Sequence, residues 1–148
     1  MVGFFVLFLS FGFINKWSGV IYITSWSAVL SHLSLLPVVA ALPAPAWARV
    51  GGYTWAVFDT ILAIATLHGV PIASITPWRL GLHVAAAIWP LGAALTNTGA
   101  VRWAGFLLSG ALGVVPLLGP SLPPEAMMIA VPFIFLWLGV VGWKLKKS

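Results

Sequence analysis

The sequence predicts an all-α integral membrane protein that folds as a bundle of five or six transmembrane helices. Of its 148 residues, 61% are hydrophobic and only 6% are charged, whereas a soluble domain has about 25% charged residues. The mean hydropathy is +1.10, which is more apolar surface than a soluble chain of this length can bury in one core. The apolar residues also form long runs separated by Pro and Gly, as expected for successive membrane spans.

The first apolar run, from Val2 to Asn15, is short for a membrane span. At about 1.5 Å per residue a helix of this length reaches about 21 Å, while the hydrocarbon layer is about 30 Å thick. We therefore expect residues 1–17 to form a short tilted span, a half-helix or an interfacial segment. The run lacks the basic first region of a secretory signal, so we expect it to be retained.

Five further runs approach the length of about 20 residues that a helix needs to cross the bilayer. We expect these helices near residues 18–42, 52–70, 80–96, 101–118 and 125–143. The breaks between them read "LPAPAWARVGG", "VPIASITPWR", "TNTG" and "GPSLPPE". Pro cannot continue a helix regularly and Gly accepts turn conformations. The whole chain, residues 1–148, is thus expected to be one polytopic membrane domain.

The segment 18–42 carries an unusual number of polar residues for a membrane helix. At about 100° per residue, four hydroxyl residues fall within one narrow arc, namely Thr24, Ser27, Ser31 and Ser34. His32 shares a second arc with Ser25, and the rest of the surface is mainly apolar. Close packing against another helix is the simplest interpretation, because small residues let helices approach. A hydrated conduit is the alternative.

Asp59, in the segment 52–70, is the strongest single indication of a functional site. A carboxylate inside a membrane helix costs about 3 kcal/mol on insertion scales and usually faces a partner or a cavity. His32 and Ser109 lie at comparable distances from the same ends of their own helices, so we expect a polar site containing Asp59, His32, Ser109 and Ser31. The pair Asp59–His32 would either exchange a proton or contact a solute, or simply fasten two helices together.

A second group of polar residues is expected near the outer surface. It contains Arg79 and His83 at the start of the segment 80–96, His68 at the end of the preceding one, and Glu125. Arg79 and His83 suit an anionic headgroup or solute. His68 and His83 are alternative ligands for haem, a pigment or a metal, since neutral imidazole is a good ligand. No recognised metal motif accompanies them, so the cofactor is left unassigned.

The segment 101–118 shows a regular spacing of small residues. Gly105, Ser109 and Gly113 recur every four residues, a pattern typical of close helix–helix contacts in membranes. Together with Ser27 and Ser34 of the segment 18–42, they are the expected helix-packing positions.

The distribution of basic residues predicts the orientation. If the C-terminal Lys144, Lys146 and Lys147 are cytoplasmic, alternation of the spans puts Arg49 and Arg102 on the same side, leaving two basic residues outside. Cytoplasmic flanks are the more basic ones. We therefore expect a multi-pass protein of the cytoplasmic membrane with its C-terminus inside. Most Trp residues near the segment ends fit an interfacial aromatic belt.

Composition excludes several classes of function. The chain has no cysteine, so disulfides and thiolate chemistry are absent, and its two acidic residues disfavour two-carboxylate catalysis. The basic residues sit at segment ends, which favours membrane topology over nucleic-acid binding. Because packing signals outnumber chemical ones, the leading interpretation is an accessory or structural subunit that packs laterally, amid lipid, with itself or with other membrane subunits. The alternatives are a small-solute or proton transporter or channel that uses Asp59 and His32, and a lipid-modifying enzyme or a haem- or pigment-binding subunit; an enzyme is the less favoured class.

Overall fold

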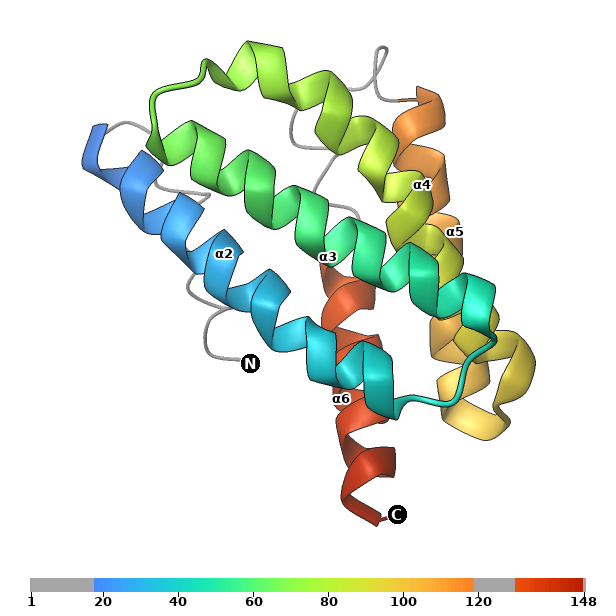
Figure 1. Ribbon diagram of the computed structural model, residues 1–148. Helices are drawn as coiled ribbons and strands as arrows, with labels where there is room; N and C mark the ends of the chain where they lie inside the picture. The colour runs from blue at the N-terminus through green and yellow to red at the C-terminus, as the bar shows by residue number, and fades with distance from the viewer. Residues whose placement is uncertain (1–17, 119–129, 148) are drawn as a thin grey trace.

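The computed structural model describes residues 18–118 and 130–147, and every regular element within them is an α-helix (Figure 1). The five helices are α2 (Ser18–Ala41), α3 (Ala46–Leu67), α4 (Ile72–Thr96), α5 (Gly99–Leu118) and α6 (Ala130–Lys147). The predicted segment 1–17 and the first residues of the predicted segment 125–143, including Glu125, lie outside the described residues.

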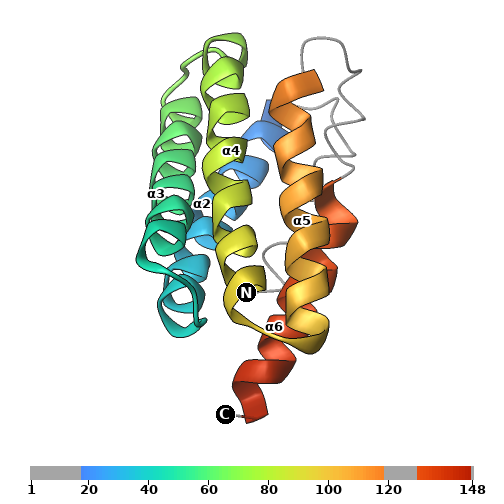
Figure 2. The same ribbon diagram turned by 90° about the vertical axis from the view of Figure 1, so that its right-hand side faces the viewer.

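Each helix packs mainly against the next one along the chain, in the pairs α2–α3, α3–α4, α4–α5 and α5–α6. The short connections after α2, α3 and α4 make these neighbours antiparallel. Figures 1 and 2 show α3 at the front of the molecule, in contact with both α2 and α4, and α5 and α6 at the back. Consequently α4 lies between the front helices and the rear pair.

Two helices begin earlier than the sequence analysis expected. α3 begins at Ala46, directly after Pro45, and α4 begins at Ile72, directly after Pro71. Pro at such a position is compatible with a helix start because its missing N–H would be unpaired there in any case. Pro77 lies inside α4 instead of ending it, since the absence of its N–H removes only one bond of the helix ladder.

Glycines allow the closest approaches between helices. A Cβ atom at Gly52 of α3 would lie 2.9 Å from Cγ of Trp89 on α4. A Cβ atom at Gly105 of α5 would lie 2.7 Å from the carbonyl oxygen of Pro90 on α4. Both contacts are shorter than a side chain tolerates, so a residue without Cβ is required at each crossing.

The largest buried side chains belong to Trp89 of α4 and Trp137 of α6, each 1% exposed. Their rings meet edge to face, with centroids 4.6 Å apart and an interplanar angle of 86°, a favourable arrangement for aromatic pairs. Leu35 of α2 and Leu108 of α5 belong to the same apolar cluster. The core therefore joins the front helices to the rear pair.

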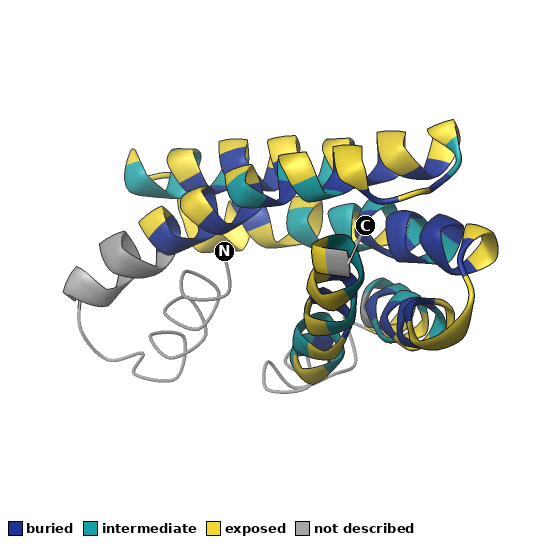
Figure 3. Cartoon of the chain, turned by 90° about the horizontal axis from the view of Figure 1, so that it is seen from below, coloured by how far each residue is buried: buried dark blue, intermediate teal, exposed yellow. Residues whose placement is uncertain are grey.

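The outward faces of the helices are also apolar. Figure 3 shows exposed residues along the outer sides of the helices, with the buried ones turned inward. Large apolar side chains are exposed on each of the five helices, among them Trp26, Leu30, Phe58, Ile61, Val84, Leu107 and Leu136. By length and composition, α3 and α5 are apolar enough to cross a membrane, among the helices that the structure describes.

Candidate functional site: a buried His–Asp–Arg cluster

The position of His32 is fixed by its own helix. The ring nitrogen Nδ1 lies 2.7 Å from the carbonyl oxygen of Ala28, one turn earlier in α2. The hydroxyl of Ser31 donates a hydrogen bond of 2.9 Å to the same carbonyl. Trp55 of α3 packs edge-on against the imidazole, with ring centroids 5.1 Å apart. The ring is thus held so that its other nitrogen, Nε2, faces away from the α2 backbone.

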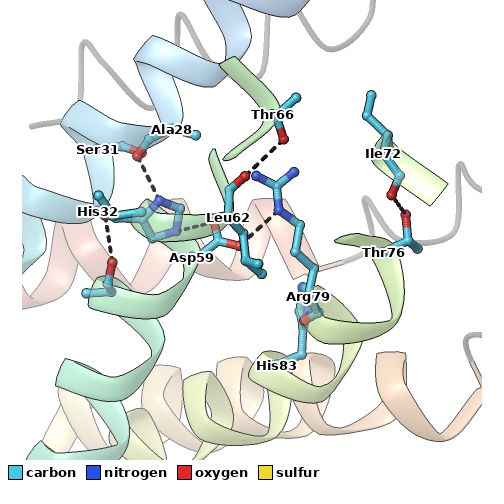
Figure 4. Close-up of polar contacts among 12 residues, drawn as sticks. Ala28, Ser31, His32, Asp59, Leu62, Thr66, Ile72, Thr76, Arg79 and His83 are labelled. Atoms are coloured by element: carbon cyan, nitrogen blue, oxygen red, sulfur yellow. Dashed lines mark hydrogen bonds and ion pairs between the residues drawn. The ribbon is translucent and has the colours of Figure 1, made fainter. Parts of the chain in front are cut away.

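Asp59 of α3 lies between His32 and Arg79 (Figure 4). Its Oδ2 atom is 3.3 Å from Nε2 of His32, and its Oδ1 atom is 3.1 Å from Nε of Arg79 on α4. The side chains of His32, Asp59 and Arg79 are 5%, 13% and 30% exposed. One buried carboxylate therefore connects three helices. We call these three residues the His–Asp–Arg cluster.

The contacts of His32 restrict where protons sit in this cluster. A carbonyl oxygen only accepts hydrogen bonds, so Nδ1 of His32 carries a hydrogen that it donates to Ala28. Nε2 then meets Asp59 in one of two ways: an imidazolium donates to the carboxylate, or a neutral imidazole accepts from the protonated acid. Both states hold a single proton between Nε2 and Oδ2. Removal of this proton leaves a lone pair on Nε2 of His32 facing a lone pair on Oδ2 of Asp59.

Arg79 belongs to this cluster through its contact with Asp59. From the sequence, Arg79 is expected beside His83, His68 and Glu125, apart from Asp59, whereas the structure places it in an ion pair with Asp59. His83 donates from Nδ1 to the carbonyl oxygen of Arg79, at 2.7 Å, and interacts electrostatically with His32. The two groups of residues that the sequence suggested are thus joined through Arg79.

The remaining members of the expected outer group are His68 and Glu125. His68 is exposed at the C-terminal cap of α3, and Glu125 lies outside the described residues. No group of three or more His, Asp or Glu side chains suited to a metal gathers within residues 18–118 and 130–147.

The expected packing residues differ in their surroundings. The Ser34 hydroxyl donates to the carbonyl oxygen of Ser31 at 2.7 Å, and Ser27 is buried. Gly105 is the close-approach glycine described above, while a Cβ at Gly113 would meet no described atom within 4 Å. Ser109 is half-buried on α5, whose main neighbours are α4 and α6. It is therefore not one of the residues paired with Asp59.

A second polar group, which the sequence analysis did not identify, lies at the opposite end of α4. Asn97 is buried and donates from Nδ2 to the carbonyl oxygens of Pro43, at 2.8 Å, and Ala93, at 2.7 Å. The ammonium group of Lys144 donates to Oδ1 of Asn97. These bonds tie the α2–α3 connection and α6 to the end of α4. The only sequence signal was the polar break "TNTG".

Comparisons of the chain with protein-family models, with curated proteins and with solved structures found no match. The His–Asp–Arg cluster combines three kinds of ionisable side chain. It offers one buried carboxylate, one imidazole with a fixed donor nitrogen, and one guanidinium that is partly exposed.

Proposed function

We propose that this chain is a multi-pass protein of the cell membrane and that its helices span the bilayer. The support is the apolar exterior: large side chains such as Phe58 and Ile61 on α3 and Leu107 on α5 are exposed. A soluble monomer rarely exposes such extended apolar surface, whereas lipid solvates it without cost. Exposed Trp side chains lie near helix ends, at Trp47, Trp103 and Trp143, where interfacial indoles are favoured.

The antiparallel order of the helices supports a cytoplasmic C-terminus. The first residues of α3 and α5 and the last residues of α6 lie at one end of the bundle (Figure 1). This end carries Arg49, Arg102, Lys144 and Lys146. The excess of basic residues marks it as the cytoplasmic side under the positive-inside rule.

Within this bundle, the pair His32–Asp59 is the proton-binding centre of a transporter or channel for protons or a small solute. The observation that carries this proposal is the donor bond from Nδ1 of His32 to Ala28, which leaves one exchangeable proton between His32 and Asp59. Ionisable groups inside a membrane bundle are costly and commonly belong to ion or proton pathways. A bare packing contact between helices requires no such groups.

Proton movement in liposomes tests this function. Vesicles that contain the purified full chain and an internal pH-sensitive dye are subjected to a membrane potential, with and without small organic solutes outside. We expect proton movement with the native chain and its loss in Asp59→Asn. His68→Asn is the matched control, because His68 is an exposed imidazole at the end of the same helix. Undiminished proton movement through a folded Asp59→Asn protein would rule out this role.

A second candidate, an accessory subunit that packs laterally, is favoured by a different observation. The helices α5 and α6 carry exposed glycines at Gly110, Gly139 and Gly142, and no described atom lies within 4 Å of the position of a Cβ on any of them. Bare glycine faces allow close approach of another membrane helix. Native mass spectrometry after extraction in a mild detergent tests this candidate: a bound second subunit that is lost in Gly139→Leu supports it, and a monomer refutes it.

A further inference from the structure

The His–Asp–Arg cluster carries more positive than negative charge when its shared proton is present. Arg79 contributes one positive charge and the proton between His32 and Asp59 a second, while the Asp59 carboxylate contributes one negative charge. The sum is one excess positive charge. An uncompensated charge in the interior of a protein or membrane is costly, so the protonated cluster favours a nearby anion.

Arg79 has the free capacity to hold that anion. Its Nε atom is buried against Asp59, yet the side chain as a whole is 30% exposed. Figure 4 shows the two terminal nitrogens extending beyond Nε, away from the carboxylate. Within residues 18–118 and 130–147, the structure gives these nitrogens no ion-pair or hydrogen-bond partner. A guanidinium presents its N–H groups in a planar fork that matches the oxygens of a carboxylate or phosphate.

We propose that the terminal nitrogens of Arg79 bind a singly charged oxyanion, and that this anion and the proton of the pair His32–Asp59 bind cooperatively. The inference rests on the proposed proton-binding function of the same pair, and it adds the chemical class of the partner. Binding of the proton supplies the positive charge that the anion neutralises, so each ligand raises the affinity of the other. This reciprocity is required of any coupling between two binding equilibria.

The anion has two chemical sources, the carboxylate of a small organic acid and the phosphate of a lipid headgroup. A hollow of about 320 Å³ lies between α3 and α4, lined by residues that include Phe58 and Leu62 on α3 and Trp78 and Leu82 on α4. Phe58 and Trp78 are the sequence neighbours of Asp59 and Arg79. Apolar substituents of either source therefore find an apolar surface on the two helices that carry these charges.

The groups that set the pH dependence come from three helices. They are His32 on α2, Asp59 on α3, and Arg79 and His83 on α4. The basic residues of α5 and α6 lie at the opposite end of the bundle. Loss of the shared proton removes the excess positive charge, so the affinity for the anion is expected to fall as pH rises.

Calorimetric titration of the full chain with acetate, in an uncharged detergent from mildly acidic to mildly alkaline pH, tests the inference. We expect acetate to bind and its affinity to fall at least about fivefold over the pH series, the lower end of typical coupling factors. Arg79→Gln is expected to abolish binding. Arg79→Lys, which keeps the charge and loses the planar fork, provides a conservative variant that weakens it. Asp59→Asn is expected to retain acetate binding and to lose its pH dependence.

Lipid nanodiscs distinguish the two sources. A lipid phosphate is the oxyanion if acetate binds only weakly and the native chain retains phosphatidylglycerol in preference to phosphatidylcholine. The variant Arg79→Gln should then lose this lipid preference, and the inference holds. Absence of both acetate binding and this lipid preference overturns it, even where proton movement still depends on Asp59 and the proposed function survives. Acetate binding that appears only in Glu125→Gln also overturns it, because Arg79 is then occupied by a carboxylate of the chain itself.

Discussion

A double-mutant cycle on Asp59 and Arg79 measures the energy of the ion pair at the centre of the site. The Oδ1–Nε distance is 3.1 Å, which corresponds to about 5 kcal/mol of attraction at an effective dielectric constant of about 20. Removal of both charges from water offsets several kcal/mol of this, and the contact lacks the alignment of a good hydrogen bond. We expect a net coupling of about 2 kcal/mol, within the range of about 0.5–3 kcal/mol for contacting residues.

The single substitutions are expected to differ from the double one in a defined way. Asp59→Asn leaves Arg79 without its counter-ion and should lower the free energy of unfolding by about 3 kcal/mol, as for other broken buried pairs. A total stability of about 5–15 kcal/mol keeps such a variant folded. The double variant Asp59→Asn with Arg79→Gln should lose about 2 kcal/mol less than the sum of the two single losses.

Reversible unfolding in mixed micelles, in which the fraction of a denaturing detergent is increased, supplies these free energies. Far-UV circular dichroism follows the loss of helix. His68→Asn combined with Arg79→Gln is the control pair, because His68 is exposed at the end of α3 and should not couple to Arg79. Additivity of Asp59→Asn and Arg79→Gln to within about 0.5 kcal/mol would refute the ion pair as an energetic link between α3 and α4.

Two further predictions concern stability. Gly105→Ala should destabilise the chain by about 1–3 kcal/mol, because its Cβ would lie 2.7 Å from the carbonyl oxygen of Pro90. Gly113→Ala in the same helix is the control and should be neutral or stabilising, because its Cβ would meet no described atom within 4 Å. Equal effects of the two substitutions in the unfolding assay would contradict this packing. Lys144→Met removes the donor to Asn97 and should increase hydrogen–deuterium exchange at the end of α4, with a loss of about 1–3 kcal/mol; unchanged exchange there would show that the bond does not hold this end together.

The helical character of the chain and the comparable depth of Asp59 and His32 follow from the sequence. Composition and the spacing of Pro and Gly indicate helices, and the positions of Asp59 and His32 within their segments place them at comparable depth. The contact of 3.3 Å between these side chains agrees with that expectation. The same reasoning applied to Ser109 does not produce a contact, because equal depth does not specify which helices are neighbours; α5 packs mainly against α4 and α6.

The pairing of Arg79 with Asp59 was not predictable from the segment boundaries that Pro residues suggested. With a helix expected to start near residue 80, Arg79 was expected at the first turn of that helix, near the outer surface. In the structure α4 begins at Ile72 and continues through Pro77. Asp59 lies eight residues before the end of α3 at Leu67, and Arg79 seven residues after Ile72. In antiparallel neighbours joined by a short turn, these distances bring the two side chains to the same level.

The burial of two Trp residues was also hidden in the sequence. The sequence alone does not distinguish a Trp at the membrane interface from a Trp in the core. Trp89 and Trp137 are buried because their rings pack against each other between α4 and α6, whereas other Trp side chains are exposed. The close approaches at Gly51 and Gly52 of α3 depend on the same information, since these glycines were expected at the boundary between a break and the segment 52–70. To predict either feature, one must know which helix is the neighbour, and the periodicity within one segment does not give this information.

Nitrogen NMR of the histidine side chains, on the full chain in lipid bilayers, tests the central claim most directly. The chain has three histidines, and the variants His68→Asn and His83→Asn assign the signal of His32. We predict that Nδ1 of His32 carries a hydrogen at every pH, while the signal of Nε2 changes as the shared proton is released and shifts in Asp59→Asn. An unprotonated Nδ1, or an Nε2 signal that does not respond to Asp59, would contradict the proton-binding centre.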